Sequence, residues 1–219
     1  MDDSQIELFK VVILGETGVG KTSIISQFID QTFQEDIQSS TGSTFSSKSF
    51  IIDKSKILKF EIWDTAGQER YRALTKMFYK DANAAILVYD ITRKISFEEL
   101  QNYWVEQIKE SAPSDIILVI VANKSDLTNK EEVDEEEARN LATKIGAFFC
   151  STSAKKSHGI DDLFLQIAKK HTGSDDIKIK NNDDEDFESQ EASQISKNGS
   201  MKLTKEKTFI KNEKKKKCC

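Results

Sequence analysis

The stretch GETGVGKT, residues 15–22, constrains the fold of this chain more than any other feature of its sequence. It matches the pattern G-x-x-x-x-G-K-[S/T] and lies between an apolar run, Leu8–Leu14, and a helical pattern, Lys21–Asp30. In that context the glycines let backbone N–H groups wrap around phosphates, and the helix N-terminus adds partial positive charge. We expect Lys21 to neutralise the β- and γ-phosphates of a nucleotide and Thr22 to ligate Mg²⁺. The alternative interpretation is a glycine turn without a ligand.

Short apolar runs alternate with helical patterns through the first 172 residues. This alternation indicates an α/β fold in which helices cover both faces of a mostly parallel sheet. Ser96 with Glu99 has the spacing of a capping box, and Asp134 with Glu137 repeats it, so Ser96 and Asp134 are the predicted N-caps. The predicted strands are Leu8–Leu14, Ile57–Trp63, Ala84–Asp90 and Ile116–Ala122, and the predicted helices are Lys21–Asp30, Ser96–Glu110, Asp134–Lys144 and Ile160–Lys170.

The length of 219 residues suits one α/β domain, residues 1–172, and an extension, residues 173–219. In the extension aromatic and β-branched residues become sparse and charged residues dominate, a composition typical of a disordered tail. The formal net charge of −5 argues against nucleic acid as a partner. The N-terminus is acidic and has no long apolar run, so we expect neither a signal peptide nor a transmembrane helix.

A second stretch that bears on phosphate binding is WDTAGQ, residues 63–68, which follows a predicted strand. We expect its Asp64 to bind Mg²⁺, because carboxylate oxygen is a ligand that this ion prefers. We expect the Gly67 N–H to donate a hydrogen bond to the γ-phosphate of the nucleotide.

Two further stretches, NKSD at residues 123–126 and TSAK at residues 152–155, indicate which base is bound. The Asp126 carboxylate can accept hydrogen bonds from N1–H and the 2-amino group of guanine. Adenine would leave this carboxylate unpaired, and a buried unpaired acceptor is costly, so the site should select GTP over ATP. The Ala154 N–H can donate to the guanine carbonyl. Together, the four stretches indicate a guanine-nucleotide site.

With these motifs the chain resembles the Ras-like small GTPases, and within them the Rab branch, from about Leu8 to Lys170. The stretches WDTAGQERYRAL, residues 63–74, and YDIT, residues 89–92, and the terminal pair of cysteines are similar to Rab sequence, and the chain is also similar to the early-endosomal Rabs. The resemblance implies a P-loop fold with a six-stranded sheet that has one antiparallel strand. It implies a switch in vesicle traffic, with an exchange factor, a GTPase-activating protein, a GDP-dissociation inhibitor and effectors as partners.

The resemblance also assigns roles to aromatic residues. It implies that Phe33 packs against the guanine ring. Phe45, Trp63 and Phe78 fall where Rabs carry the aromatic triad that effectors contact, with Phe78 in place of the usual tyrosine. The residues expected to contact the nucleotide are Gly15, Glu16, Thr17, Gly18, Val19, Gly20, Lys21, Thr22, Ser23, Phe33, Ser40, Gly67, Asn123, Lys124, Asp126, Ser153, Ala154 and Lys155.

The first switch departs from the Rab pattern, in which the Mg²⁺-binding threonine is followed by isoleucine and glycine. Gly42 fixes the register in the stretch QSSTGSTF, so Thr41 takes the isoleucine place and Ser40 the threonine place. Ser40 keeps a hydroxyl for Mg²⁺ but lacks the methyl group that stiffens the threonine rotamer. We expect an intact switch with a looser loop.

The expected catalytic residues are Gln68, which orients the attacking water, and Lys21, which stabilises charge on the transferring phosphoryl group. A weakly or non-hydrolysing GTP-bound adaptor is one alternative, motivated by Ser40 and Thr41, and Gln68 argues against it. An ATP-using P-loop kinase or ATPase is a second alternative, which the stretch NKSD makes improbable.

The chain ends in KKKKCC, four lysines followed by Cys218 and Cys219. In Rab-like chains this ending implies geranylgeranyl groups on both cysteines, which would anchor the protein to a membrane. The resemblance implies a place on the cytoplasmic face of an intracellular membrane, with a cytosolic pool, and the similarity to the early-endosomal Rabs suggests an endosomal membrane. An unmodified tail is the alternative.

Overall fold

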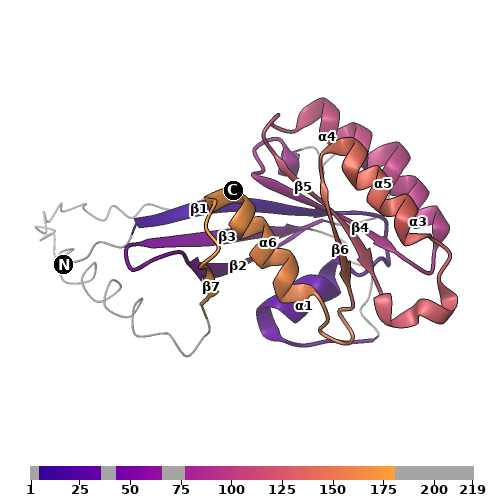
Figure 1. Ribbon diagram of the computed structural model, residues 1–219, viewed down its shortest axis with the longest axis horizontal. Helices are drawn as coiled ribbons and strands as arrows, with labels where there is room; N and C mark the ends of the chain where they lie inside the picture. The colour runs from indigo at the N-terminus through magenta and orange to yellow at the C-terminus, as the bar shows by residue number, and fades with distance from the viewer. Residues whose placement is uncertain (1–4, 36–42, 66–76, 181–219) are drawn as a thin grey trace, which may run out of the picture. The chain divides into compact units, whose positions relative to one another are not determined.

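A computed structural model of the chain describes residues 5–35, 43–65 and 77–180. The strands form one seven-stranded sheet in the order β6-β5-β4-β1-β3-β2-β7. Figure 1 labels them on the ribbon. The strands are β1 (Gln5–Leu14), β2 (Thr44–Ile51), β3 (Lys56–Asp64), β4 (Ala84–Asp90), β5 (Ile117–Asn123), β6 (Phe148–Thr152) and β7 (Lys178–Ile179). The helices are α1 (Lys21–Asp30), α3 (Lys94–Glu99), the π turn η2 (Leu100–Trp104), α4 (Val105–Ser111), the 3₁₀ helix η3 (Ser125–Lys130), α5 (Glu135–Ile145) and α6 (Ile160–Thr172).

The sheet is mostly parallel, as the alternation of strands and helices predicted. β1 pairs in parallel with β3 and β4, and β5 pairs in parallel with β4 and β6. β2 is antiparallel to both β3 and β7. The expected count of six strands is therefore short by one, because β7 adds a strand beyond α6.

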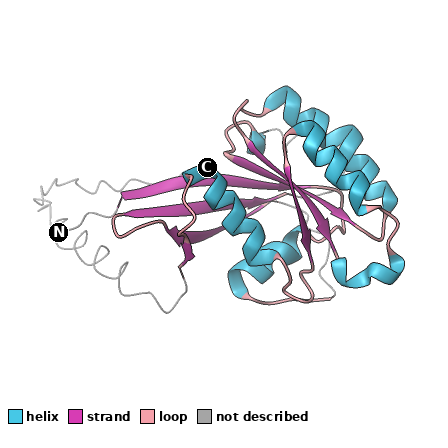
Figure 2. Cartoon of the chain, in the orientation of Figure 1, coloured by secondary structure: helices cyan, strands magenta, loops and turns pink. Residues whose placement is uncertain are grey.

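Helices cover both faces of the sheet, which Figure 2 shows by colour. On one face α1 and α6 pack over alternate β1 side chains such as Val11 and Ile13. On the other face α3, α4 and α5 pack over Val12 and Leu14. Every residue of β4 is buried, as expected of a strand covered on both sides.

The predicted helix Ser96–Glu110 is one helical stretch that begins earlier, at Lys94, and contains the π turn η2. The prediction that Ser96 is the N-cap is wrong, because Arg93 holds that position with an extended backbone. The Ser96 hydroxyl lies inside the first turn, 2.7 Å from the Arg93 carbonyl, and accepts a hydrogen bond from the Asp90 N–H. The prediction for α5 is confirmed: Asp134 is its N-cap and accepts from the Glu136 N–H at 2.8 Å.

The chain turns back after α6 at Gly173, whose φ of 67° lies in the left-handed region that favours glycine. Ile177 then inserts into the core beneath the sheet and is only 9% exposed. Lys178 and Ile179 pair with Ile51 and Phe50, and the Lys180 N–H donates to the Ser49 carbonyl at 2.9 Å. Among the described helices none is long and apolar enough to cross a membrane.

Candidate nucleotide-binding site

The loop from Gly15 to Gly20 connects β1 to α1 and passes close to two other parts of the chain. Gly15 has φ 146°, and a Cβ added there would lie 2.3 Å from the Val88 carbonyl oxygen. Gly20 has φ 98°, and a Cβ added there would lie 2.3 Å from Asn123 Nδ2. Both positions therefore require glycine, for conformation and for space.

Lys21 begins α1 and reaches back over the same loop. Its Nζ donates to the carbonyl oxygens of Gly15 at 3.0 Å and Glu16 at 2.9 Å. The residue is 6% exposed, and burial lowers the pKa of its ammonium group to about 8. Phosphate groups beside it would favour the charged form, because an opposite charge nearby raises the pKa of a lysine.

Thr22 and Asp64 meet although they lie 42 residues apart: the Thr22 hydroxyl donates to Asp64 Oδ2 at 2.6 Å. Burial raises the pKa of Asp64, and its Oδ1 is buried without a hydrogen-bond partner. A hydroxyl and a carboxylate fit Mg²⁺, which prefers oxygen ligands and takes the rest from water and phosphate. Within residues 5–35, 43–65 and 77–180 no cluster of three or more His, Cys, Asp or Glu residues could hold a metal alone. Water and nucleotide phosphates would supply further ligands.

Asn123, at the end of β5, links the phosphate loop to the two loops expected to bind guanine. Its side-chain amide donates to the Val19 carbonyl at 2.8 Å, and its Oδ1 accepts from the Thr152 hydroxyl at 3.2 Å. The next residue, Lys124, has φ 66° and pairs its Nζ with Asp90 Oδ2 at 2.6 Å. Asn123 is buried, so it acts by holding these loops together.

Asp126 and Ser153 belong to the two loops predicted to recognise guanine, and they form a hydrogen bond of 2.6 Å. Lys155, two residues further on, pairs its Nζ with Glu35 on the opposite side of the site. Ala154, which lies between Ser153 and Lys155 in the chain, is buried.

These loops surround a cavity of about 480 Å³, a size within the usual range for small-molecule sites. Most predicted nucleotide-contacting residues line it: Thr17, Gly18, Gly20, Lys21, Thr22, Ser23, Phe33, Asn123, Lys124, Asp126, Ala154 and Lys155. Gly15, Glu16, Val19 and Ser153 are not among the residues that line it. Gln34, Glu35, Thr65 and Leu127 also line the cavity. Thr65 lies within the stretch WDTAGQ but had no role assigned to it, and the other three belong to no motif. Ser40, Gly67, Gln68, Cys218 and Cys219 lie outside the described residues.

The three aromatic residues predicted to contact effectors lie side by side. Phe45 and Trp63 are directly opposite in the β2–β3 register, and their ring centroids are 5.3 Å apart. The centroids of Trp63 and Phe78 are 5.4 Å apart. Phe45 is 51% exposed, so an apolar side chain faces solvent at one end of this aromatic row.

Comparison with known proteins gives the family. The family model described as the Ras family matches residues 10–172. Ras-related protein Rab-22A of Mus musculus is 43% identical over 166 residues, which are 76% of this chain and 84% of the relative. Rab-22A of Homo sapiens and Rab-22A of Canis lupus familiaris are each 42% identical over 166 residues, with the same shares covered. The resemblance seen in the motifs is therefore confirmed, and the chain belongs to the Ras family as a Rab-type small GTPase.

Proposed function

We propose that this GTPase alternates between GDP-bound and GTP-bound states at the cytoplasmic face of an endosomal membrane, anchored by a lipidated pair of terminal cysteines. The observation that carries the proposal of nucleotide binding is that Lys21, Thr22 and Asp126 line one cavity. Asp64 is hydrogen-bonded to Thr22, and Ser153 to Asp126. These groups come from the ends of parallel strands, where α/β folds bind their ligands. The resemblance to the early-endosomal Rabs motivates the choice of membrane.

The roles of the residues follow from their chemistry. Lys21 binds the β- and γ-phosphates and stabilises the charge that develops on the transferring phosphoryl group. Thr22 and Asp64, with Ser40, hold Mg²⁺, which neutralises phosphate charge. Gln68 orients the attacking water. Asp126 and Ala154 hold the guanine base, and Phe33 packs against its ring.

Hydrolysis without a partner is slow in this proposal, because the sequence has no inserted domain that could supply an arginine to the transition state. A GTPase-activating protein that contributes an arginine would raise the rate by about 10³–10⁵-fold. An exchange factor releases GDP, effectors contact Phe45, Trp63 and Phe78 in the GTP state, and a GDP-dissociation inhibitor shields the lipids in the cytosol.

The test is single-turnover hydrolysis by GTP-loaded protein, alone and with each of a panel of activating proteins for Rab-type GTPases. The wild type should hydrolyse GTP slowly alone and rapidly with an activating protein. Gln68→Leu should slow both rates while GTP affinity stays nearly unchanged, because the side chain acts on the water. Gln101→Leu, at an exposed glutamine on the π turn, is the matched control and should behave as the wild type does.

Two outcomes would contradict the proposal. A wild type that no activating protein stimulates would favour the non-hydrolysing adaptor suggested by Ser40 and Thr41. ATP that displaces bound GDP as well as GTP does would exclude a guanine-specific switch.

A further inference from the structure

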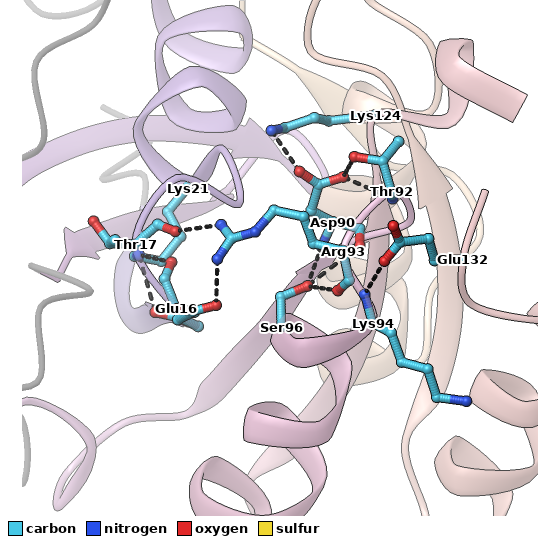
Figure 3. A network of polar contacts seen from close by, with 11 residues as sticks. Glu16, Thr17, Lys21, Asp90, Thr92, Arg93, Lys94, Ser96, Lys124 and Glu132 are labelled. Atoms are coloured by element: carbon cyan, nitrogen blue, oxygen red, sulfur yellow. Dashed lines mark hydrogen bonds and ion pairs between the residues drawn. The ribbon is translucent and has the colours of Figure 1, made fainter. Parts of the chain in front are cut away.

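Arg93 lies next to the phosphate loop although it belongs to no nucleotide-binding motif. It follows β4 and is the N-cap of α3, and Figure 3 shows its guanidinium extending toward Glu16 and Thr17 of the phosphate loop. Nη1 donates to the Thr17 carbonyl at 3.0 Å, and Nη2 donates to Glu16 Oε2 at 2.9 Å. One side chain thus holds both the backbone and a carboxylate of the loop.

The backbone of Arg93 is itself fixed, so the guanidinium has a firm base. Its N–H donates to the Asp90 carbonyl at 3.0 Å, and its own carbonyl accepts from the Ser96 N–H at 3.0 Å. The Ser96 hydroxyl lies 2.7 Å from the same carbonyl. This turn presents the arginine to the loop in one orientation.

Holding the Thr17 carbonyl also orients a donor on the other side of the loop. The Thr17 carbonyl and the Gly18 N–H belong to one trans peptide plane, so they point in opposite directions. Arg93 lies on the carbonyl side, and Gly18 lines the cavity. Gly18 has φ 78° and as a glycine would otherwise have wide conformational freedom.

The contact with Arg93 also affects the charge of Glu16. Its carboxylate is a negative charge beside a site for phosphate, and the ion pair with Arg93 offsets that charge while the Glu16 carbonyl accepts from Lys21 Nζ. Figure 3 shows the carboxylate turned toward Arg93.

Asp90 connects this contact to the guanine loop. It is 1% exposed, and its Oδ1 accepts from the Thr92 N–H at 2.9 Å and the Thr92 hydroxyl at 2.7 Å. Its Oδ2 pairs with Lys124 Nζ at 2.6 Å. The turn that positions Arg93 and the loop that contains Lys124 therefore share one buried carboxylate.

We infer that Arg93 is a positioning residue for the phosphate loop, and that Asp90 ties it to the guanine loop, so that one polar network preorganises both halves of the nucleotide site. The inference rests on the proposed function, because it assumes that guanine nucleotide binds in this cavity. It predicts that loss of Arg93 weakens binding of the β-phosphate and leaves binding of the base and α-phosphate nearly intact.

The experiment measures the affinities of GDP and GMP, and the rate of GDP dissociation, for full-length protein with Mg²⁺. GMP lacks the β-phosphate, so the ratio of the two affinities isolates the phosphate loop, whereas a general loss of structure would lower both alike. Arg93→Ala should speed GDP dissociation roughly five- to tenfold, the effect of charged hydrogen bonds discounted for partial exposure. GMP affinity should change less than roughly twofold, since no contact of Arg93 reaches the guanine loop directly.

Three further variants sharpen the test. Arg93→Lys keeps the charge but loses the planar fork, so it should restore part of the GDP affinity. Arg93→Ala should have a smaller effect in a Glu16→Gln background, because one of its two contacts is already weakened. Lys94→Ala is the matched control, since the Lys94 side chain points away from the network in Figure 3, and it should match the wild type.

Asp90→Asn tests the link to the guanine loop. It keeps an acceptor for Thr92 and removes the charge that pairs with Lys124, so it should weaken GDP and GMP alike. A melting curve checks that the Asp90→Asn variant folds. If it does not fold, Thr92→Val provides the test, because it removes one of the two Thr92 donors that orient the Asp90 carboxylate. Thr92→Val should also weaken the binding of both GDP and GMP.

The outcomes separate the inference from the proposed function. Wild-type protein that binds neither GDP nor GMP would refute the proposed function. Wild-type protein that binds GDP, together with an unchanged GDP-to-GMP ratio in Arg93→Ala, would overturn the role of Arg93 alone. An equal loss of both nucleotides in Arg93→Ala would show a merely structural role and would also overturn it.

Discussion

The Ser153 hydroxyl donates a hydrogen bond of 2.6 Å to Asp126 Oδ1, which joins the two loops expected to bind guanine. The same hydroxyl oxygen accepts from the Lys156 N–H at 3.1 Å. With its acceptor occupied by an N–H, the hydroxyl is directed as a donor to the carboxylate. Asp126 is thus held in one orientation where it lines the cavity.

We predict that Asp126→Asn shifts nucleotide preference from guanine to xanthine, because the 2-oxo group of xanthine would meet an amide donor. GTP affinity should fall roughly 100-fold, as expected for the loss of two charged hydrogen bonds. Ser153→Ala should weaken GTP only about tenfold, because it removes one bond to the carboxylate and keeps the carboxylate itself. Competition between GTP and XTP measures both effects, and unchanged GTP preference in Asp126→Asn would rule out this assignment.

Binding of GDP should take up a proton at pH 8.5. Burial lowers the pKa of Lys21 to about 8 in the free protein, so a large part of this lysine is neutral at that pH. Phosphates would raise its pKa, and the complex therefore holds more protons than the free protein. By linkage, GDP affinity should decrease as pH rises above 8.

Calorimetry in buffers of different ionisation enthalpy measures this proton. The control is the same titration with Mg²⁺ at pH 7, where Lys21 is charged in both states and uptake should be small. No dependence on the buffer at pH 8.5 would show that Lys21 stays charged in the free protein.

Sequence reasoning found four strands, each through a run rich in apolar residues. The predicted strand Ala84–Asp90, an apolar run closed by one aspartate, is a strand with the same bounds. β2, with the sequence TFSSKSFI, was not identified by pattern because only Phe50 among its residues is buried. β7 has two residues and is set by its pairing with Phe50 and Ile51, a contact that no local pattern encodes.

The nucleotide site also contains residues that the sequence identified and residues that it did not. Each predicted motif lies directly at the end of a strand, so a parallel sheet had to bring the motifs together. Arg93 could not be found in this way, because its role depends on a turn meeting the phosphate loop 76 residues away. One feature of the sequence could have identified Asp90, because it is an acidic residue at the end of a buried strand. Ser96 matched a capping box, yet the helix begins before it at Lys94.

In the first switch, which lies outside the described residues, we predict that Ser40→Ala weakens Mg²⁺-dependent closure around GTP and that Thr41→Ala changes it little. The reason is the register fixed by Gly42, which gives Ser40 the Mg²⁺-binding hydroxyl. Effector binding by the GTP-loaded variants measures the closure. A larger loss from Thr41→Ala would mean that the register is wrong by one residue.

We predict that Ile177→Ser lowers the free energy of unfolding by about 2 kcal/mol, the cost of exposing most of a buried isoleucine. Ile177 is 9% exposed and belongs to the core beneath the sheet. Ile95→Ser is the matched control, because Ile95 is 53% exposed on α3, and its effect should stay within about 0.5 kcal/mol. Urea unfolding of the GDP-bound variants measures both, and equal effects would show that the segment after α6 adds nothing to the stability of the sheet.

The last prediction concerns the terminal pair, Cys218 and Cys219. Two geranylgeranyl groups would give stable anchoring, whereas one lipid chain binds membranes only weakly and reversibly. Lys214–Lys217 would add about 1 kcal/mol for each lysine near an anionic surface. The third cysteine, Cys150, is buried, and burial raises the pKa of its thiol to about 11, so we expect no lipid there.

Mass spectrometry of the C-terminal peptide from cells should therefore find lipid on both terminal cysteines. The double variant Cys218→Ser, Cys219→Ser should move from membrane fractions to the cytosol, whereas Cys150→Ala, the matched control, should stay on membranes. A wild-type peptide without lipid would refute the anchor. Retention of the double variant on membranes would show instead that protein contacts or the basic segment hold the GTPase there, because the loss of two prenyl chains removes the main apolar contribution to membrane binding.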